Sequence, residues 1–191
     1  KNGINNIKKI LYVGGIKETK GVLDLLNACA ILKSRNIQFN LNLIGQFDSV
    51  IFKEKVLEFI KQHALEERVF LLGIKIGKDK WDEYAQANIF CFPSYYECET
   101  FGNVLVEAMQ FKLPVVSTIW RGIPDIVKND ESGFLVEINS PISIANKLEE
   151  LIENEALRIR FGNNGRRLFK EKFTEQTYFS NFEDEVYSVC V

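Results

Sequence analysis

Short apolar runs alternate along the chain with longer segments in which apolar residues recur every three or four positions. The short runs mostly lack the apolar–polar alternation of a half-buried strand, so they predict strands that are buried on both faces. The longer segments predict helices with an apolar face. The predicted strands span residues 10–13, 39–44, 69–72, 89–92, 114–117 and 133–136. The predicted helices span residues 22–33, 50–65, 81–87, 103–111, 141–153, 156–170 and 174–189.

This order of elements predicts an α/β fold, namely a Rossmann-like, doubly wound parallel sheet of about six strands with helices on both faces. In such a sheet, ligands bind beyond the carboxyl ends of the strands. Four of the first five predicted strands stop at a turn-forming residue, which is Gly14, Gly45, Gly73 or Pro93. The loops that follow, residues 14–20, 45–49, 73–80 and 93–102, are therefore the candidate binding region.

The segment 93–109 carries the most informative chemistry. The helix after Gly102 is apolar on nearly all sides and is expected to be buried, yet Glu107 lies in its middle. A buried carboxylate is costly without a partner, so Glu107 must meet a cation, a hydrogen-bond donor or a polar cleft. An internal salt bridge would satisfy Glu107 as well as a ligand would.

A second carboxylate, Glu99, lies just before the same helix. The helix N-terminus, with free amide groups around Phe101, Gly102 and Asn103, falls between the two carboxylates. Helix N-termini attract anions, phosphate above all, and Gly102 lets a ligand approach the backbone closely. At 1.5 Å per helical residue the arrangement covers roughly 10 Å. The order of carboxylate, anion site and carboxylate matches the sugar hydroxyls, diphosphate and ribose hydroxyls of a nucleotide diphospho-sugar.

The loop 14–21 is rich in glycine and opens the first predicted helix with two lysines, Lys17 and Lys20. Lysines at a helix N-terminus oppose the helix dipole, and an anionic ligand would reverse that penalty. Two solvated surface lysines are the alternative interpretation. The loop has neither the spacing of a Walker A motif nor that of a G-x-G-x-x-G fingerprint.

Composition narrows the classes of function. The 191 residues, 46% of them hydrophobic, are typical of one globular domain. A net charge of −2 gives no reason to expect a nucleic-acid partner, and a single histidine, His63, excludes a multi-histidine metal site. Apolar runs reach about six residues, far short of the ~20 that span a bilayer. The absence of a signal peptide and of C-x-x-C pairs favours a cytoplasmic location.

An ordered set of motifs resembles one known family. The set comprises Lys20-Gly21, the strand ending at Gly73, the Glu99-x7-Glu107 pair within the segment 93–107, the strand 114–117, and the stretch 122–136 with Gly122-Ile-Pro-Asp125. It resembles the C-terminal, sugar-donor-binding domain of retaining glycosyltransferases with the GT-B fold, family 4, from about residue 10 to residue 173. The chain would then be one half of a GT-B fold.

The resemblance implies a role for each matching position. Glu107 would hold the ribose hydroxyls, Glu99 would act at the donor sugar near the reacting carbon, and Lys20 would neutralise the diphosphate leaving group. The resemblance also implies that the donor is bound by Gly14, Gly15, Lys17, Ile74, Lys75, Thr100, Phe101, Gly102, Asn103 and Val104. It implies transfer with retained anomeric configuration from a nucleotide diphospho-sugar of the UDP or GDP type, with no metal and no further cofactor.

The sequence also departs from the family pattern. The family usually has Gly-Arg where this chain has Gly14-Gly15, so an arginine for the diphosphate is missing, and Lys17 or Arg121 would have to replace it. This departure keeps an alternative open, a catalytically inactive nucleotide-sugar-binding domain. An epimerase or a phosphorylase-like relative with the same fold is a further alternative.

The expected organisation has three parts. Residues 1–7 are interpreted as the remnant of a linker, residues 8–173 as the nucleotide-sugar-binding domain, and residues 174–191 as a C-terminal helix that packs toward an absent N-terminal domain. The acceptor would be bound through that domain, and the longer protein could lie at the inner membrane face. The apolar core is expected to include Phe90, Phe92, Phe101, Phe134, Phe161 and Phe169.

Overall fold

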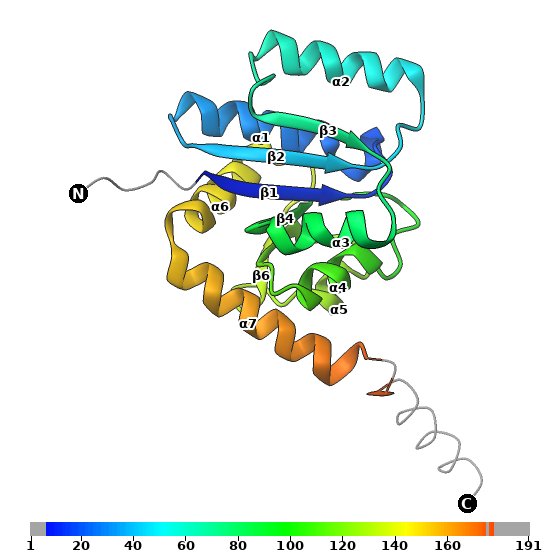
Figure 1. The fold of residues 1–191 in the computed structure, drawn as a ribbon, viewed down its shortest axis with the longest axis vertical. Coiled ribbons are helices and arrows are strands. Elements are labelled where there is room, and N and C mark those ends of the chain that lie inside the picture. Colours follow the sequence, from blue (N-terminus) through cyan, green and yellow to red (C-terminus); the bar gives the residue numbers. More distant parts are fainter. Residues whose placement is uncertain (1–6, 175, 178–191) are drawn as a thin grey trace, which may run out of the picture.

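The computed structural model describes residues 7–174 and 176–177 (Figure 1). The strands are β1 (Lys8–Val13), β2 (Phe39–Ile44), β3 (Val69–Gly73), β4 (Ile89–Phe92), β5 (Val115–Thr118) and β6 (Gly133–Val136). The helices are η1 (Glu18–Lys20), α1 (Val22–Ser34), α2 (Val50–Gln62), α3 (Gly77–Gln86), α4 (Asn103–Gln110), α5 (Ile123–Ile126), α6 (Pro141–Glu153) and α7 (Glu155–Lys172). Nearly all of the predicted linker and of the predicted helix 174–191 lies outside the described residues.

The six strands form one parallel sheet in the order β3-β2-β1-β4-β5-β6. β1 pairs with β2 along its whole length, from Lys8 opposite Phe39 to Val13 opposite Ile44. On its other side β1 pairs with β4, where Ile10 lies opposite Ile89. The chain order reverses between β1 and β4, and this reversal is the point where doubly wound sheets bind ligands. The predicted fold class is therefore confirmed.

Helices cover both faces of the sheet. Figure 1 shows α1 and α2 on one side of β1–β3 and α3 and α4 on the other. α6 packs against α1, and α7 packs against α4. The strands β1, β4 and β5 are fully buried at their centres, as at Leu11, Phe90 and Val116, whereas the edge strand β3 leaves Phe70 38% exposed. Burial on both faces explains why β4 and the centre of β1 are continuously apolar.

Short elements and element boundaries differ from the predictions. The structure adds η1 and α5, which the apolar pattern did not predict, because η1 buries no residue and α5 spans a single turn. α3 begins at Gly77, four residues before the predicted start, because its first turn is polar and exposed. α2 ends at Gln62 rather than at residue 65, because the backbone at Ala64 adopts the left-handed conformation, with φ of 49°.

Two expectations about burial were wrong. α4 buries only Leu105, Ala108 and Met109, whereas Val104 and Val106 are partly exposed at the border of the core. Phe101 is 48% exposed, since it lies in the loop before α4 and not on a packed face. The remaining predicted core phenylalanines pack as expected, namely Phe90, Phe92, Phe134, Phe161 and, partly exposed, Phe169.

Candidate functional site

The loops that follow β1 and β4 lie side by side at the reversal of strand order. The Tyr95 N–H in the second loop donates to the Thr19 carbonyl oxygen in the first at 2.9 Å. Gly21, the N-cap of α1, has φ of 70°, and a Cβ there would lie 2.0 Å from the Pro93 carbonyl oxygen. Only glycine fits such a position, because other residues meet both the left-handed strain and the clash. The two loops therefore form one surface.

Lys20 and Glu99 form an ion pair across this surface. Glu99 is 8% exposed, and the same oxygen, Oε2, also accepts a hydrogen bond from Ser94 Oγ at 2.8 Å. The buried carboxylate is thus satisfied by a cation and a hydroxyl group. An ammonium group has three N–H donors, so Lys20 retains donors for a second acceptor while it holds Glu99.

The two lysines of the first loop both contact the Tyr96 ring. Lys17 Nζ lies 3.3 Å from the centroid of the ring and Lys20 Nζ lies 4.6 Å from it, which are cation–π distances. Trp120 Nε1 donates to the Tyr96 carbonyl oxygen at 2.8 Å and so ties the loop to the segment after β5. Arg121 is exposed, and its guanidinium lies over the Trp120 ring at 5.4 Å. Lys17 is therefore the cation that shares a ring with Lys20.

The N-terminus of α4 carries no side-chain cap. Its N-cap, Gly102, has φ of 57°, and its first turn contains no acidic residue. Thr100, Phe101 and Asn103 around it are exposed. A Cβ at Gly122 would lie 2.1 Å from the Thr100 carbonyl oxygen, so the loop after β5 supports this turn closely. Uncapped N–H groups at a helix N-terminus form a partial positive charge that suits an anion.

Glu107 lies one and a half turns into α4, with Val104 partly exposed on the turn before it. Its Oε1 accepts from Lys80 Nζ at 2.8 Å, and its Oε2 accepts from the Tyr84 hydroxyl at 2.7 Å. Burial, followed by the charge of Glu107, raises the pKa of Tyr84 above its usual range, so Tyr84 stays protonated and donates. Glu107 therefore has both a cation and a hydrogen-bond donor, as the sequence required.

Lys80 and Tyr84 come from α3 and were missed by the sequence analysis. They stand four residues apart, so they share one face of the helix, and this spacing is the signal that could have found them. The predicted start at residue 81 left Lys80 in a loop. The structure also places Lys80 Nζ over the Trp81 ring at 4.1 Å.

The other predicted residues line the edges of the same region. A Cβ at Gly14 would lie 3.2 Å from the Phe92 ring and 3.3 Å from the Tyr12 hydroxyl, whereas a Cβ at Gly15 would meet nothing within 4 Å. The Gly15 carbonyl oxygen accepts a hydrogen bond from the Tyr12 hydroxyl at 2.9 Å. Ile74 is 65% exposed after β3. Lys75 pairs with Glu83 at 2.7 Å, and within the described residues no hydrogen bond or ion pair joins it to Lys20, Glu99 or Glu107.

The geometry divides the candidate site into two groups. Lys17, Lys20 and Glu99 gather at the loops after β1 and β4, while Glu107 gathers with residues of α3. The uncapped end of α4 begins five residues before Glu107, about 7.5 Å along the helix axis. The arrangement offers carboxylate acceptors on either side of an uncapped helix end, with Lys20 paired to one of them and Lys80 to the other.

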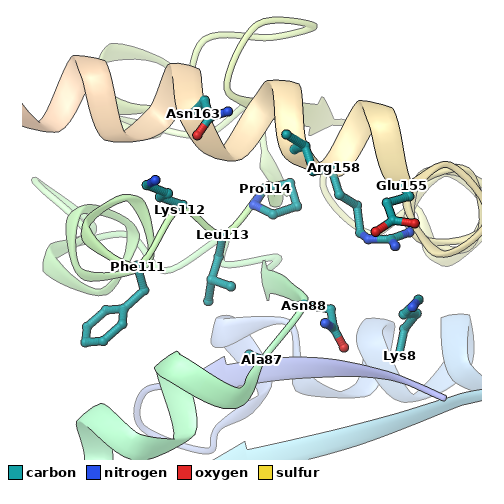
Figure 2. A pocket seen from close by; sticks show the side chains of 11 residues that line it. Lys8, Ala87, Asn88, Phe111, Lys112, Leu113, Pro114, Glu155, Arg158 and Asn163 are labelled. Atoms are coloured by element: carbon teal, nitrogen blue, oxygen red, sulfur yellow. The ribbon is translucent and has the colours of Figure 1, made fainter. Parts of the chain in front are cut away.

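A separate pocket opens at the opposite edge of the sheet (Figure 2). Its volume is about 420 Å³, and it is lined near the amino ends of β1, β4 and β5 by Lys8, Asn88 and Pro114, together with residues of α7. None of the predicted site residues lines it. Its polar wall includes Arg158, whose guanidinium already donates to the carbonyl oxygens of Leu151 and Ile152 at 2.6 and 2.9 Å. The pocket therefore lies apart from the candidate site.

Two other classes of site find no support in the part of the chain that the structure describes. No three His, Cys, Asp or Glu residues gather there in a way that could hold a metal ion. Over the same residues, each helix is too short or too polar to cross a bilayer.

Comparison with known proteins identifies the family. The family described as glycosyl transferases group 1 matches residues 1–168. The chain is 33% identical over 180 residues to the capsular polysaccharide biosynthesis glycosyltransferase CapM of Staphylococcus aureus. The matched region covers 94% of this chain and 46% of CapM. The chain spans about half the length of the curated relatives it matches.

Solved structures share the fold. The C-terminal domain of the glycosyl transferase group 1 family protein LpcC from Francisella tularensis matches with a TM-score of 0.79 and 28% identity, over 88% of this chain and 87% of that one. HepE of Anabaena, solved in complex with UDP-glucose, matches with a TM-score of 0.85 and 23% identity, over 96% of this chain and 49% of HepE. The family match covers most of the chain, and the fold agrees with it. This chain belongs to the glycosyl transferases group 1 family.

Proposed function

We propose that this chain is the C-terminal, donor-binding half of a retaining glycosyltransferase that uses a nucleotide diphospho-sugar and needs no metal ion. One observation carries the proposal. The uncapped N-terminus of α4 lies between Glu99 and Glu107 at the carboxyl edge of the sheet, with Lys20 beside it. A ligand with hydroxyls at both ends and a diphosphate between them has the matching chemistry.

Each side chain has a role in this proposal. Glu107 accepts hydrogen bonds from the ribose hydroxyls. Lys20 and the backbone amide groups of Phe101, Gly102, Asn103 and Val104 meet the diphosphate, and Thr100 lies at the same turn. Lys17 takes the place of the missing arginine, because it shares the Tyr96 ring with Lys20. Gly14 and Gly15 let the phosphates approach the first loop, and Ile74 and Lys75 line the base.

The same residues serve the proposed reaction. The bond between the anomeric carbon and the diphosphate oxygen breaks, and its electron pair stays on the diphosphate. Lys20 and the α4 N-terminus stabilise the charge that grows there. Glu99 holds Lys20 and accepts from a hydroxyl of the sugar. The acceptor oxygen bonds to the anomeric carbon on the face that the diphosphate leaves, and its proton passes to the departing diphosphate.

Relatives support the choice of substrate. CapM is named as a capsular polysaccharide biosynthesis glycosyltransferase, and the HepE structures contain UDP or UDP-glucose. We therefore propose a uridine diphospho-sugar first and a guanosine diphospho-sugar second. We propose that the acceptor is bound by a further domain, since the curated relatives are about twice the length of this chain.

A thermal-shift screen of UDP, GDP, ADP and their sugars tests the proposal. A ligand at 100 times its Kd stabilises the folded state by about 2.7 kcal/mol, which corresponds to a rise in Tm of roughly 5–10 °C for a chain of this size. No shift with any of these ligands would overturn the proposal and favour a domain that does not bind nucleotide sugars.

Glu107→Gln then tests the ribose assignment by isothermal titration. The amide still accepts from Tyr84 but loses the charge, so we expect nucleotide affinity to fall by about 1–3 kcal/mol. Glu150→Gln, on the exposed face of α6, is the matched control and should bind like the parent chain. Equal affinities for the two variants would remove Glu107 from the site.

A further inference from the structure

A buried hydroxyl group beneath the candidate site has one close partner. Tyr84 is fully buried, and its ring stacks on Phe90 and Phe111 with centroids 5.6 and 5.5 Å away. Its hydroxyl group donates to Glu107 Oε2 at 2.7 Å. The Val104 carbonyl oxygen lies 3.5 Å from that hydroxyl, too far to compete with the carboxylate. The rigid ring therefore holds its donor in one place.

The two oxygens of Glu107 differ in how firmly they are held. Oε2 is bound by Tyr84, which has no exposed surface and whose ring packs against Phe90, Phe111 and Trp81. Oε1 is bound by Lys80 Nζ, whose side chain is 20% exposed on a flexible stem. The Glu107 side chain is itself 22% exposed, so solvent and ligands reach it. A ligand can replace or join Lys80 at Oε1, whereas it cannot reach Tyr84.

We propose that Tyr84 is a positioning residue for nucleotide recognition: it fixes the carboxylate of Glu107 so that Oε1 meets the ribose hydroxyls, while Lys80 is the group that these hydroxyls replace. The inference rests on the proposed function. A carboxylate held before the ligand arrives loses less conformational entropy on binding. Such a site discriminates against an analogue without hydroxyls, because that analogue forms no hydrogen bond to Oε1 of the held carboxylate.

Tyr84→Phe tests the inference, because it removes the hydroxyl and keeps the stacked ring. The measured quantity is the ratio of the Kd for 2′,3′-dideoxy-UDP to the Kd for UDP, or for the guanosine pair if GDP binds more tightly in the screen. We expect a ratio of about tenfold or more in the parent chain, the value of one charge-assisted hydrogen bond. In Tyr84→Phe we expect this ratio to fall several-fold, with the dideoxynucleotide bound as before.

Tyr12→Phe is the matched control. It also removes the hydroxyl of a fully buried tyrosine, but that hydroxyl donates to the Gly15 carbonyl oxygen. A merely structural loss would lower Tm in both variants. Only Tyr84→Phe should lower the ratio, since any effect of Tyr12→Phe applies equally to both nucleotides.

Lys80→Met provides a second test that does not depend on the folding of Tyr84→Phe. It leaves the Tyr84 bond to Glu107 in place, so the ratio should be retained or rise. A Kd ratio that falls to near one in Lys80→Met, or that stays unchanged in Tyr84→Phe, would overturn the inference and leave the proposed function standing. A ratio near one in the parent chain, or no binding of either nucleotide, would overturn the proposed function and the inference with it.

Discussion

Lys20 and Glu99 neutralise each other at the point where the loops after β1 and β4 meet. Each was assigned a separate task from the sequence, one toward phosphate and the other toward sugar. Their contact adds a structural task, because a carboxylate at 8% exposure is stable only with partners. The same pair is thus expected to matter for folding as well as for binding.

Lys20→Met is therefore expected to lower the free energy of unfolding by about 1–3 kcal/mol, since it leaves Glu99 with Ser94 alone. Urea denaturation measures the change. Glu99→Gln in the same background should recover part of the loss, because a neutral amide is cheaper to bury. A Lys20→Met variant as stable as the parent chain would show that the ion pair adds nothing.

At the scale of elements, the start of α1 determines how closely the two loops approach. Gly21→Ala is expected to destabilise the fold by at least about 1–3 kcal/mol, because it combines a left-handed φ with a Cβ placed 2.0 Å from the Pro93 carbonyl oxygen. Gly15→Ala is the control, since its Cβ meets nothing within 4 Å, and it should change stability by only about 0.5 kcal/mol. Equal Tm values for the two variants would contradict this account of the contact.

The position of α3 depends on a second charged contact. Glu83 accepts from Lys75 at 2.7 Å and from Asn42 at 2.8 Å, so α3 is tied to β2 and to the segment after β3. Burial raises the pKa of Glu83, but the bonds from Lys75 and Asn42 outweigh that effect, and the pKa falls below its ordinary value of 4.5.

Because the pKa of Glu83 is lower in the folded state than in the unfolded state, its ionised form stabilises the fold at pH values above the unfolded-state pKa. This stabilisation is lost as the pH falls through the folded-state pKa. The Tm of the parent chain should therefore exceed that of Glu83→Gln at pH 6, and the difference should shrink between pH 4.5 and pH 3. Thermal melts across this range check the trend. A constant difference would mean that Glu83 does not titrate in this way.

The chain as a whole spans about half the length of relatives such as CapM. If it supplies the donor-binding half, it should bind a nucleotide sugar with measurable Kd but neither transfer nor hydrolyse it faster than buffer alone. Product analysis by chromatography, with a full-length relative such as CapM as the positive control, measures this. Turnover by the 191-residue chain alone would contradict the division of labour between two halves.

Most of the fold was predictable from local pattern. Five of the six predicted strands lie within one residue of their observed bounds at each end, and β1 begins two residues earlier than predicted. Apolar runs located the strands because the run itself is a local property, although the edge strand β3 is only partly buried. The exposure of Phe101 was not predictable, because an aromatic side chain in a loop can be covered or left open by elements far along the chain. The single-turn α5 and η1 left no periodic pattern.

The sequence by itself determined the α/β class, the order of the elements and the strand-end loops that form the candidate site, since these follow from short-range apolar pattern and from Gly and Pro at strand ends. It also required that Glu107 have a partner. The tertiary structure decided which partner: Lys20 meets Glu99 from 79 residues away, and Tyr84 and Lys80 meet Glu107 from 23 and 27 residues away. Such pairs depend on how the sheet brings β1 beside β4 and α3 beside α4, and no local pattern encodes that proximity.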